Sequence, residues 1–312
     1  MLTTLKRILT AADRGKYAVG AFNINNLEAL QAVIETAVDQ RSPVIVQTTE
    51  GAVEYAGMDY LEAMVSVAAK SPVPVAFHLD HGKDLKVVRR AINSGYTSVM
   101  YDGSILPYRQ NAGNTKKVVR WAHAKGVSVE AEIGAISGVE DLVSVSEKQA
   151  VFTDPEEALK FWKETGCDAL AISVGTAHGP NKFKAEAKLD IPRLRQIDEL
   201  VKIPLVLHGA SEIDEEMVKR TKKMCDVFGD CQRLAKAKGV PDAEIRKAIR
   251  AGIRKINIDS DLRIAFTAGI REDIVKRNDT IDPRKLLATS KKLMKDVVRD
   301  RMRVFGSRNR AK

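Results

Sequence analysis

The sequence predicts an α/β protein of the (β/α)8 TIM-barrel class, and two observations support this fold. Eight short apolar runs alternate with segments of helical periodicity along 312 residues. Histidine, aspartate and glutamate stand where these runs end, and α/β barrels carry their chemistry at the carboxyl ends of their strands. A doubly wound sheet would need a glycine-rich loop after the first strand, whereas residues 24–27 are Ile-Asn-Asn-Leu.

The expected elements follow these runs in order. Between the first two runs, in 28–40, apolar residues recur at helical spacing and define one face. The connection 134–154 has no strong helical period, and we expect a mobile loop over the catalytic end. The connection 212–248 is expected to hold two helices in place of one, and we expect a single domain over 1–312. The expected strands are Tyr17–Asn23, Pro43–Thr49, Val73–Asp80, Ser98–Gly103, Ser128–Gly134, Ala169–Val174, Pro204–Gly209 and Lys255–Ser260.

The composition predicts a globular protein of the cytoplasm. Met1 is followed by a polar, amphipathic stretch without the apolar core of a signal peptide. Apolar segments long enough to span a membrane are absent from the sequence. The three cysteines, Cys167, Cys225 and Cys231, are odd in number and lack the spacing of a zinc or redox motif, which favours reduced thiols.

The net charge of +10 is concentrated at the C-terminus. Residues 284–312 hold eleven basic and two acidic residues, which leaves 40 basic and 39 acidic residues for the rest of the chain. This distribution excludes a globally basic nucleic-acid binder, and aromatic residues that could stack on bases do not interleave with the charges. We expect a solvated helix face here, with a subunit contact or a contribution to an anionic substrate as alternatives. A candidate subunit contact is formed by Leu293, Val297, Val298 and Met302.

Three histidines each close an apolar run and precede a glycine, namely His81, His178 and His208. A single strand-end histidine is more commonly structural, but a barrel gathers all its strand ends into one ring. Three neutral imidazoles there would bind zinc and leave room for a substrate, as catalytic zinc sites do. Such an ion polarises a carbonyl and stabilises an enolate. We expect His78 and His123 to be structural.

Acidic residues end three neighbouring runs. Because neighbours on a strand point in different directions, Asp80 need not bind the same metal as His81. It is placed to move protons beside that metal. Asp102 and Glu132 could orient the metal ligands or hold a second cation.

The later strand ends offer backbone amides to an anion. Gly179 and the segments Gly209–Ser211 and Asn257–Ser260 stand where barrels bind phosphate. Lys182 could reach the same phosphate, although a surface lysine is an equally good interpretation.

Together these blocks resemble the class II, metal-dependent fructose-bisphosphate aldolases, a family that includes the tagatose-bisphosphate aldolases. The similarity runs nearly end to end and is most specific in HLDHG (78–82), GTAHG (175–179), LHGAS (207–211) and NIDSD (257–261). The resemblance implies that His81, His178 and His208 bind the catalytic zinc and that Asp80 is the proton donor. It places a second cation, divalent or monovalent, at Asp102 and Glu132.

The resemblance also implies the enolisation base and the substrate contacts. Glu140, in the loop after the fifth strand, is implied to take the proton that gives the enediolate. The chain departs from the family pattern at 180–182 and at Glu212, where glycine is common, and we expect Glu212 to face solvent and begin the next helix. The implied substrate contacts are Asn23, Thr49, Gly179, Lys182, Gly209, Ala210, Ser211, Asn257, Ile258, Asp259 and Ser260.

The resulting hypothesis is a zinc aldolase that reversibly cleaves fructose 1,6-bisphosphate into glycerone phosphate and glyceraldehyde 3-phosphate. Tagatose 1,6-bisphosphate is an alternative substrate. A Schiff-base mechanism would need a buried lysine on a barrel strand, and the sequence offers only Lys255, at an expected strand start. A non-catalytic sugar-phosphate or RNA-binding barrel is the alternative of another class. The family resemblance implies a homodimer or homotetramer.

Overall fold

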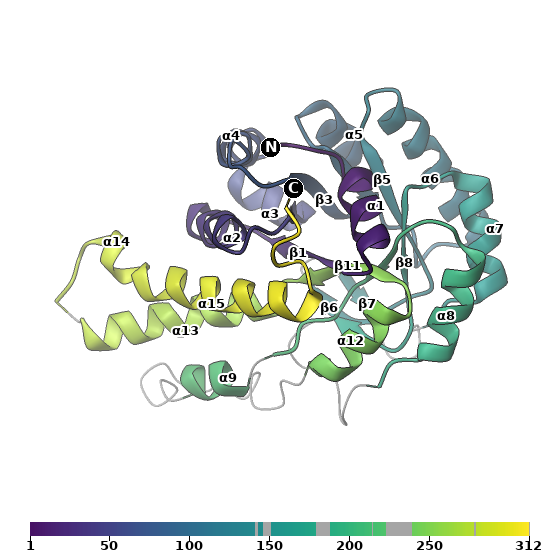
Figure 1. Cartoon of the computed structure of the whole chain (residues 1–312). Coiled ribbons are helices and arrows are strands. Elements are labelled where there is room, and N and C mark those ends of the chain that lie inside the picture. Colours follow the sequence, from purple (N-terminus) through teal and green to yellow (C-terminus); the bar gives the residue numbers. More distant parts are fainter. Residues whose placement is uncertain are drawn as a thin grey trace.

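The computed structural model describes residues 1–140, 143–145, 151–178, 188–213, 215–222, 239–277 and 279–311, with the backbone alone at 137–140, 143–145 and 177–178. Eight parallel strands close into a barrel in the order β1-β11-β10-β8-β5-β4-β3-β2 (Figure 1). The predicted (β/α)8 fold is confirmed. The barrel strands are β1 Val19–Asn23, β2 Val44–Thr48, β3 Val75–Gly82, β4 Ser98–Tyr101, β5 Ser128–Ile133, β8 Ala169–Ile172, β10 Leu205–Leu207 and β11 Ile253–Ile258.

Helices surround this barrel. Most begin at a side chain that caps their first turn, for example Asn26, Thr49, Asp84 and Asp154, each of which accepts a backbone N–H two or three residues ahead. The helices are α1 Leu5–Gly15, α2 Leu27–Asp39, α3 Glu50–Ala56, α4 Met58–Ala68, α5 Leu85–Asn93, α6 Tyr108–His123, α7 Pro155–Thr165, α8 Ile191–Leu200, α9 Glu215–Lys222, α12 Asp242–Arg250, α13 Ser260–Lys276, α14 Pro283–Leu286 and α15 Ala288–Phe305.

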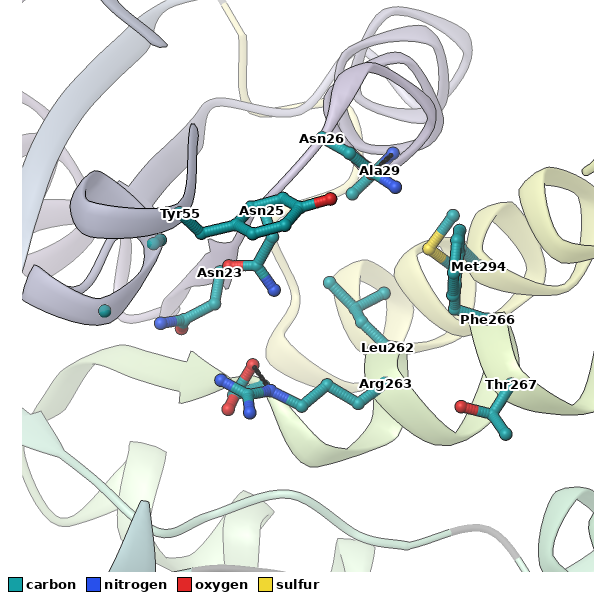
Figure 2. A pocket seen from close by; sticks show the side chains of 13 residues that line it. Asn23, Asn25, Asn26, Ala29, Tyr55, Leu262, Arg263, Phe266, Thr267 and Met294 are labelled. Carbon is teal, nitrogen blue, oxygen red and sulfur yellow. Dashed lines mark hydrogen bonds and ion pairs between the residues drawn. The ribbon is translucent and has the colours of Figure 1, made fainter. Parts of the chain in front are cut away.

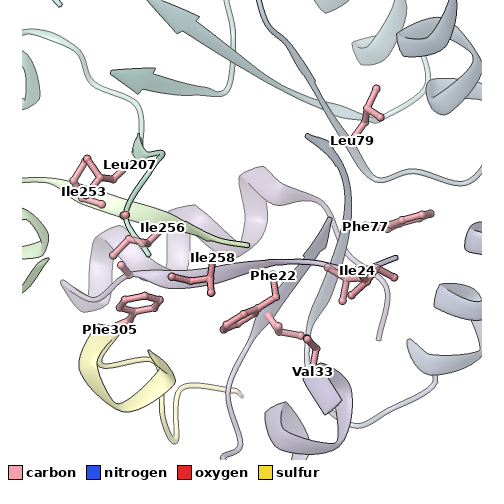
Figure 3. Close-up of a cluster of buried hydrophobic side chains, with 14 of the residues drawn as sticks. Phe22, Ile24, Val33, Phe77, Leu79, Leu207, Ile253, Ile256, Ile258 and Phe305 are labelled. Atoms are coloured by element: carbon pink, nitrogen blue, oxygen red, sulfur yellow. The ribbon is translucent and has the colours of Figure 1, made fainter. Parts of the chain in front are cut away.

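The structure has two apolar clusters, one that fills the amino-terminal end of the barrel and one that lies between the barrel and its outer helices. Helix α1 packs Leu5, Ile8, Leu9 and Ala12 against inward-facing side chains at the amino ends of the strands, which closes that end. The larger cluster lies between the strands and the outer helices and holds Phe22, Phe77, Ile256 and Phe305, among others (Figure 3). The chemistry is therefore confined to the carboxyl ends of the strands.

A second, three-stranded sheet lies beyond the barrel, formed by β6 Ser137–Glu140, β7 Val143–Val145 and β9 Ala177–His178 in the order β7-β6-β9. Part of the connection 134–154, which we expected to lack regular structure, is thus a hairpin of β6 and β7. Ser137 pairs with Ala177 and Gly138 with His178. The prediction that His178 ends a barrel strand is wrong, because β8 stops at Ile172 and His178 lies on β9. Backbone pairing to the loop after β5 holds this histidine.

Helices α13 and α15 form a long antiparallel arm that leaves the barrel, with α14 at its tip (Figure 1). The candidate subunit contact on α15 is not available, because Leu293, Val298 and Met302 are buried within the chain and Val297 packs against the same core. The basic residues of this helix are also engaged. Lys291 and Lys295 both pair with Glu35 of α2.

Two expectations from the composition concern the thiols and the membrane. Cys167 is a buried free thiol, and burial raises its pKa to about 12; Cys225 and Cys231 lie outside the described residues. None of the helices in the described ranges combines the length and the apolar character that a bilayer crossing demands.

Candidate active site

Polar residues fill the upper part of the barrel interior because alternate residues of each strand point inward. On β11, Lys255 and Asn257 alternate with buried isoleucines, and on β5, Glu130 and Glu132 flank Ala131. Hydrogen bonds across the barrel join these residues into two levels. The upper level contains Asn23, Gln47, Asp80, His81, Asp102, Glu132, His208 and Asn257, and the lower level contains His78, Ser98, Glu130 and Lys255.

Strand β3 breaks its alternation where the two reactive residues stand. Its register against β4 shifts between Leu79 and Gly82, and His81 has φ +49°. A Cβ on Gly82 would lie 2.6 Å from the carbonyl oxygen of Met100, so the strands approach closely here. One ligand atom each from Asp80, His81 and His208 lies within 4.8 Å of the others, so Asp80 stands beside the two histidines although it neighbours His81 on the strand. The irregularity brings a carboxylate and an imidazole to one point.

The carboxylate of Asp80 is held by three side-chain amides and is fully buried. Its Oδ2 accepts from Nδ2 of Asn23 at 3.1 Å and from Nε2 of Gln47 at 3.0 Å. Its Oδ1 accepts from Nδ2 of Asn257 at 2.9 Å. Donors from β1, β2 and β11 therefore fix the orientation of a group that stands beside His81.

His81 and His208 face each other edge to face, with Nε2 of His81 2.9 Å from Nδ1 of His208. The other nitrogen of each ring meets a carboxylate: Nδ1 of His81 lies 2.9 Å from Asp102 Oδ2, and Nε2 of His208 lies 2.9 Å from Glu130 Oε1. A carboxylate beside one nitrogen of each ring favours an N–H at that nitrogen, so the two facing nitrogens, which share a hydrogen bond with each other here, are the ones that a metal would bind in place of the proton between them. Two of the three histidines predicted to meet therefore lie together.

Carboxylates crowd this pair. Burial would lower the pKa of His81, but Asp80, Asp102 and Glu132 raise it well above its usual value. The hydrogen bond from His81 outweighs burial at Asp102 and holds the pKa of that acid below its usual range. Burial, together with Asp102, raises the pKa of Glu132 far above normal. These shifts pair a protonated His81 with the ionised Asp102 and favour the neutral form of Glu132 when no cation is bound.

Glu132 identifies where a cation would be accepted. Its Oε2 is buried and accepts no hydrogen bond from the described residues, and it lies 3.5 Å from Nδ1 of His208. One ligand atom each from His81, Asp102 and Glu132 also lies within 4.8 Å of the others. Imidazole nitrogens and carboxylate oxygens are ligands for zinc and similar divalent metals, so the side chains present fit such an ion.

The lower level is balanced by its own charges. Glu130 is fully buried, and its Oε2 lies 2.9 Å from Nζ of Lys255, which is equally buried. Nε2 of His78 stands 3.5 Å from the same oxygen, and its Nδ1 meets Ser98 Oγ at 2.9 Å. Burial, followed by the charge of Lys255, holds the pKa of His78 well below normal. His78 is structural, as expected.

The segments after β10 and β11 are joined by one carboxylate. Asp261, in the first turn of α13, accepts the backbone N–H groups of Glu212 and Ile213. This fixes Gly209, which has φ +60°, together with Ala210 and Ser211, against the start of α13. The prediction that Glu212 faces solvent and begins a helix is wrong, because its side chain is half-buried and bonded to Arg301, and α9 begins at Glu215.

A cavity of about 640 Å³ lies between Asn23, Tyr55 and the start of α13 (Figure 2). Asn23, which donates to Asp80, and Asp259, which receives Nε of Arg263 at 2.8 Å, both line it. Tyr55 forms one wall (Figure 2). Its remaining lining is Asn25, Asn26, Ala29, Gly51, Ala52, Leu262, Phe266, Thr267 and Met294. The cavity offers amide groups and one guanidinium, and Asn23 connects it to the reactive carboxylate.

The fructose-bisphosphate aldolase class-II family model matches residues 3–310. The chain belongs to this family. It is therefore an aldolase, a lyase. A fructose-bisphosphate aldolase of Thermus caldophilus is 46% identical over all of both chains, and one of Helicobacter pylori strain J99 is 43% identical over 99% of this chain and all of that protein. The crystal structure of the YdjI aldolase of Escherichia coli K12 superposes with a TM-score of 0.80 at 31% identity, covering all of both chains.

Several predicted residues of this aldolase cannot be placed. Gly179 and Lys182 lie outside the described residues. His178 and Glu140 lie on β9 and β6, and only their backbone is described.

Three further predicted substrate contacts can be placed. Thr49 is buried and accepts the N–H of Ala52 at the start of α3. Ile258 is buried in the apolar cluster, and Ser260 is buried at the start of α13.

Sequence reasoning missed two residues of this aldolase, Gln47 and Arg263, and weighed Lys255 only as a Schiff-base candidate. Gln47 lies two positions before Thr49, and Lys255 lies two positions before Asn257. Because residues two apart on a strand point to the same side, strict alternation would have identified both as inward-facing. Lys255 is the third residue of β11, and the prediction that it starts the strand is wrong. Arg263 lies one helical turn after Asp259, a spacing that places both on one face of α13.

Proposed function

We propose that this aldolase cleaves fructose 1,6-bisphosphate reversibly into glycerone phosphate and glyceraldehyde 3-phosphate. The observation that carries the proposal is the meeting of His81 and His208 beside an amide-held Asp80. One of the amides, Asn23, also lines a cavity that contains a guanidinium. The relatives that match over the full chain are named fructose-bisphosphate aldolases, which supports this substrate over other ketose bisphosphates.

The metal is proposed to be zinc, bound by His81, His208 and His178. A bound zinc ion supplies Lewis-acid polarisation of the ketose carbonyl. Asp102 and Glu130 take the N–H of His81 and His208 and so present the opposite nitrogen of each ring. Asp102 and Glu132 are proposed to hold a second cation, because Glu132 keeps a buried oxygen that accepts no hydrogen bond from the described residues.

Asp80 is proposed to carry the proton between the C4 hydroxyl and the aldehyde oxygen. In cleavage its carboxylate takes the hydroxyl proton as the C3–C4 bond breaks, and in condensation it returns that proton. Asn23, Gln47 and Asn257 hold both of its oxygens in place, so the carboxylate is oriented before the substrate arrives. Glu140 is proposed as the base that removes and returns the proton at C3 of glycerone phosphate.

Two phosphate positions are proposed from the surrounding backbone and side chains. Gly209 to Ser211 and Asn257 to Ser260, with Gly179 and Lys182, would bind the phosphate of the ketose half at the start of α13. Asn23 and Arg263, which line the cavity, would bind the aldehyde half together with Thr49. The position of Arg263 supports a second anionic group at that end.

The Schiff-base alternative is disfavoured by the surroundings of Lys255. Its Nζ contacts Glu130 at 2.9 Å and 3.2 Å and is fully buried in the level beneath the histidines. A Schiff base would require this amine to leave that salt bridge and reach the substrate carbonyl.

We further propose a cytoplasmic homo-oligomer. Ile274, Val275 and Ile281, on the arm, expose 40%, 40% and 95% of their surface, which supports a contact between copies there. Light scattering on the purified chain tests it, and a monomer at working concentration would contradict it. Nucleic acid is not a proposed partner, because Lys291, Lys295 and Arg301 of the basic helix are already paired with acids.

One assay separates these possibilities. The purified chain is given fructose 1,6-bisphosphate or tagatose 1,6-bisphosphate, with and without a chelator, and with borohydride in parallel. We expect cleavage that favours fructose 1,6-bisphosphate, loss of activity on chelation, and no covalent trapping. Preference for tagatose 1,6-bisphosphate would make that sugar the substrate, whereas a borohydride-trapped adduct would indicate a Schiff-base mechanism in place of a metal-dependent one. Absence of cleavage with either sugar would indicate a protein that binds the sugar phosphate without cleaving it.

A further inference from the structure

We propose that Lys255 and Glu130 are positioning residues that orient His208 for metal binding. The proposal rests on the metal-dependent function above and extends it to the level beneath the metal ligands. Three strands converge on the Glu130 side chain: β10 brings His208, β11 brings Lys255 and β3 brings His78. All of these side chains are fully buried.

The first step concerns His208. Its ring has two nitrogens, and only one can face His81 and the metal. Because Glu130 Oε1 lies 2.9 Å from Nε2, the N–H is fixed on that nitrogen and Nδ1 is left as the ligand atom. A carboxylate bonded to a metal-binding histidine fixes its tautomer and ring orientation and raises its basicity. Glu130 therefore decides which nitrogen of His208 binds.

The second step concerns Glu130 itself. Free to rotate, its carboxylate would compete with the histidines for the cation above, as Glu132 is placed to do. Nζ of Lys255 contacts both of its oxygens, at 2.9 Å and 3.2 Å, and holds it at the lower level. Nε2 of His78, at 3.5 Å, closes the third side. Lys255 thus acts on the metal site through Glu130.

The third step concerns stability, which does not by itself explain the pair. A buried ion pair stabilises a fold little, because desolvating both charges offsets their attraction, and apolar residues of similar volume commonly replace such pairs without loss. A salt bridge retained at zero exposure directly beneath the ligand histidines therefore points to a role that an apolar pair could not fill. That role is the orientation of His208.

The test compares two double variants that leave no lone buried charge, Lys255→Met/Glu130→Leu and Lys255→Met/Glu130→Gln. Zinc affinity of the metal-free proteins is measured by competition with a chromophoric chelator, and the visible spectrum of bound Co²⁺ reports the ligand geometry. We expect zinc to bind the Leu variant about 10- to 100-fold more weakly, with an altered Co²⁺ spectrum. The Gln variant, which keeps an acceptor for His208, should fall between it and the wild type.

A distant ion pair provides the matched control. Arg220 and Glu272 form a bidentate salt bridge between α9 and α13, and Arg220→Met/Glu272→Leu should bind zinc as the wild type does. Thermal unfolding of each metal-free variant checks folding; if the Leu variant does not fold, the Gln variant decides. Wild-type affinity and an unchanged Co²⁺ spectrum in a folded double variant would overturn the proposal. Failure of the wild-type protein to bind zinc would instead overturn the proposed function.

Discussion

Glu130 and Glu132 stand two residues apart on β5 and point into the same barrel, yet their surroundings differ completely. Glu130 meets a buried lysine and two histidines. Both acids have a buried oxygen that accepts no hydrogen bond from the described residues, but the one on Glu130 lies 2.9 Å from the Lys255 ammonium. Burial together with Asp102 raises the pKa of Glu132 far above normal, and none of the ion pairs among the described residues joins a lysine or arginine to this acid.

This difference distinguishes the part of the barrel interior whose charges the chain pairs by itself from the part that would bind a metal cofactor. The lower level contains its own positive charge, Lys255, which pairs with Glu130. The upper level gathers Asp80, Asp102 and Glu132 around the His81 and His208 side chains. Buried charges persist when they are paired or bind a metal, so the upper level is the part of the barrel interior that requires a cation.

The largest expected effect comes from removing a ligand of the upper level. His208→Ala should abolish zinc retention and lower kcat/KM on the order of a thousandfold or more, because Lewis-acid stabilisation contributes several kcal/mol. Metal content and the rate of fructose 1,6-bisphosphate cleavage measure this. His123→Ala, which removes a histidine paired with Asp168 outside the barrel interior, should retain both metal and activity. Full activity of a metal-free His208→Ala variant would contradict the metal-dependent mechanism.

The next effect separates proton transfer from metal binding within the upper level. Asp80→Asn should retain zinc but lower kcat about 10²- to 10⁴-fold, the range expected for loss of a general acid–base group. Metal analysis of the same preparation is the internal control. Loss of zinc in parallel with activity would instead make Asp80 a ligand.

A third comparison tests the two glutamates directly through the stability of the metal-free protein. Glu130→Gln leaves Lys255 buried without its charge partner and should lower the free energy of unfolding by about 3 kcal/mol. Glu132→Gln removes an acid without a cation and should leave that free energy unchanged or slightly higher. Urea unfolding at neutral pH measures both, and equal losses would show that the two levels do not differ as described.

The smallest expected effect concerns a third acid, outside both levels. Burial raises the pKa of Glu212 to about 6, although Arg301 opposes the shift. A raised folded-state pKa stabilises the fold below pH 4.5 and loses that contribution as pH rises through about 6. Glu212→Gln should remove this loss, roughly 1 kcal/mol after allowance for solvent screening. Melting temperatures at pH 4.5 and 7 measure it, with Glu156→Gln on the exposed face of α7 as control. An unchanged difference between variant and wild type across these pH values would contradict the shift.

Much of the barrel was predictable from the sequence because parallel strands that are buried on both faces consist of continuous apolar runs. Errors arose where a charged residue was taken as a boundary. Lys255 was placed at a strand start, although a lysine can stand inside a strand when an acid such as Glu130 faces it across the barrel. That pairing joins residues 125 positions apart, and local patterns do not record it.

The site was predictable in its residue types and less so in its geometry. His81, His208 and Asp80 meet as expected, but the shifted register of β3 places Asp80 and His81 together where alternation separated them. His178 lies on β9 because it pairs with Gly138, a contact between two loops. The apolar residues of α15 pack inside the chain because α13 and α2 cover them. Each difference is a tertiary contact that one sequence segment does not specify.

The most direct test of the upper level as a metal site is a single titration. The purified aldolase is stripped with chelator until metal analysis finds no bound ion, and zinc is then returned in steps while cleavage of fructose 1,6-bisphosphate is followed. We predict no cleavage by the stripped protein and full recovery as the site saturates with zinc. Cleavage at the original rate by the metal-free protein would contradict the central claim.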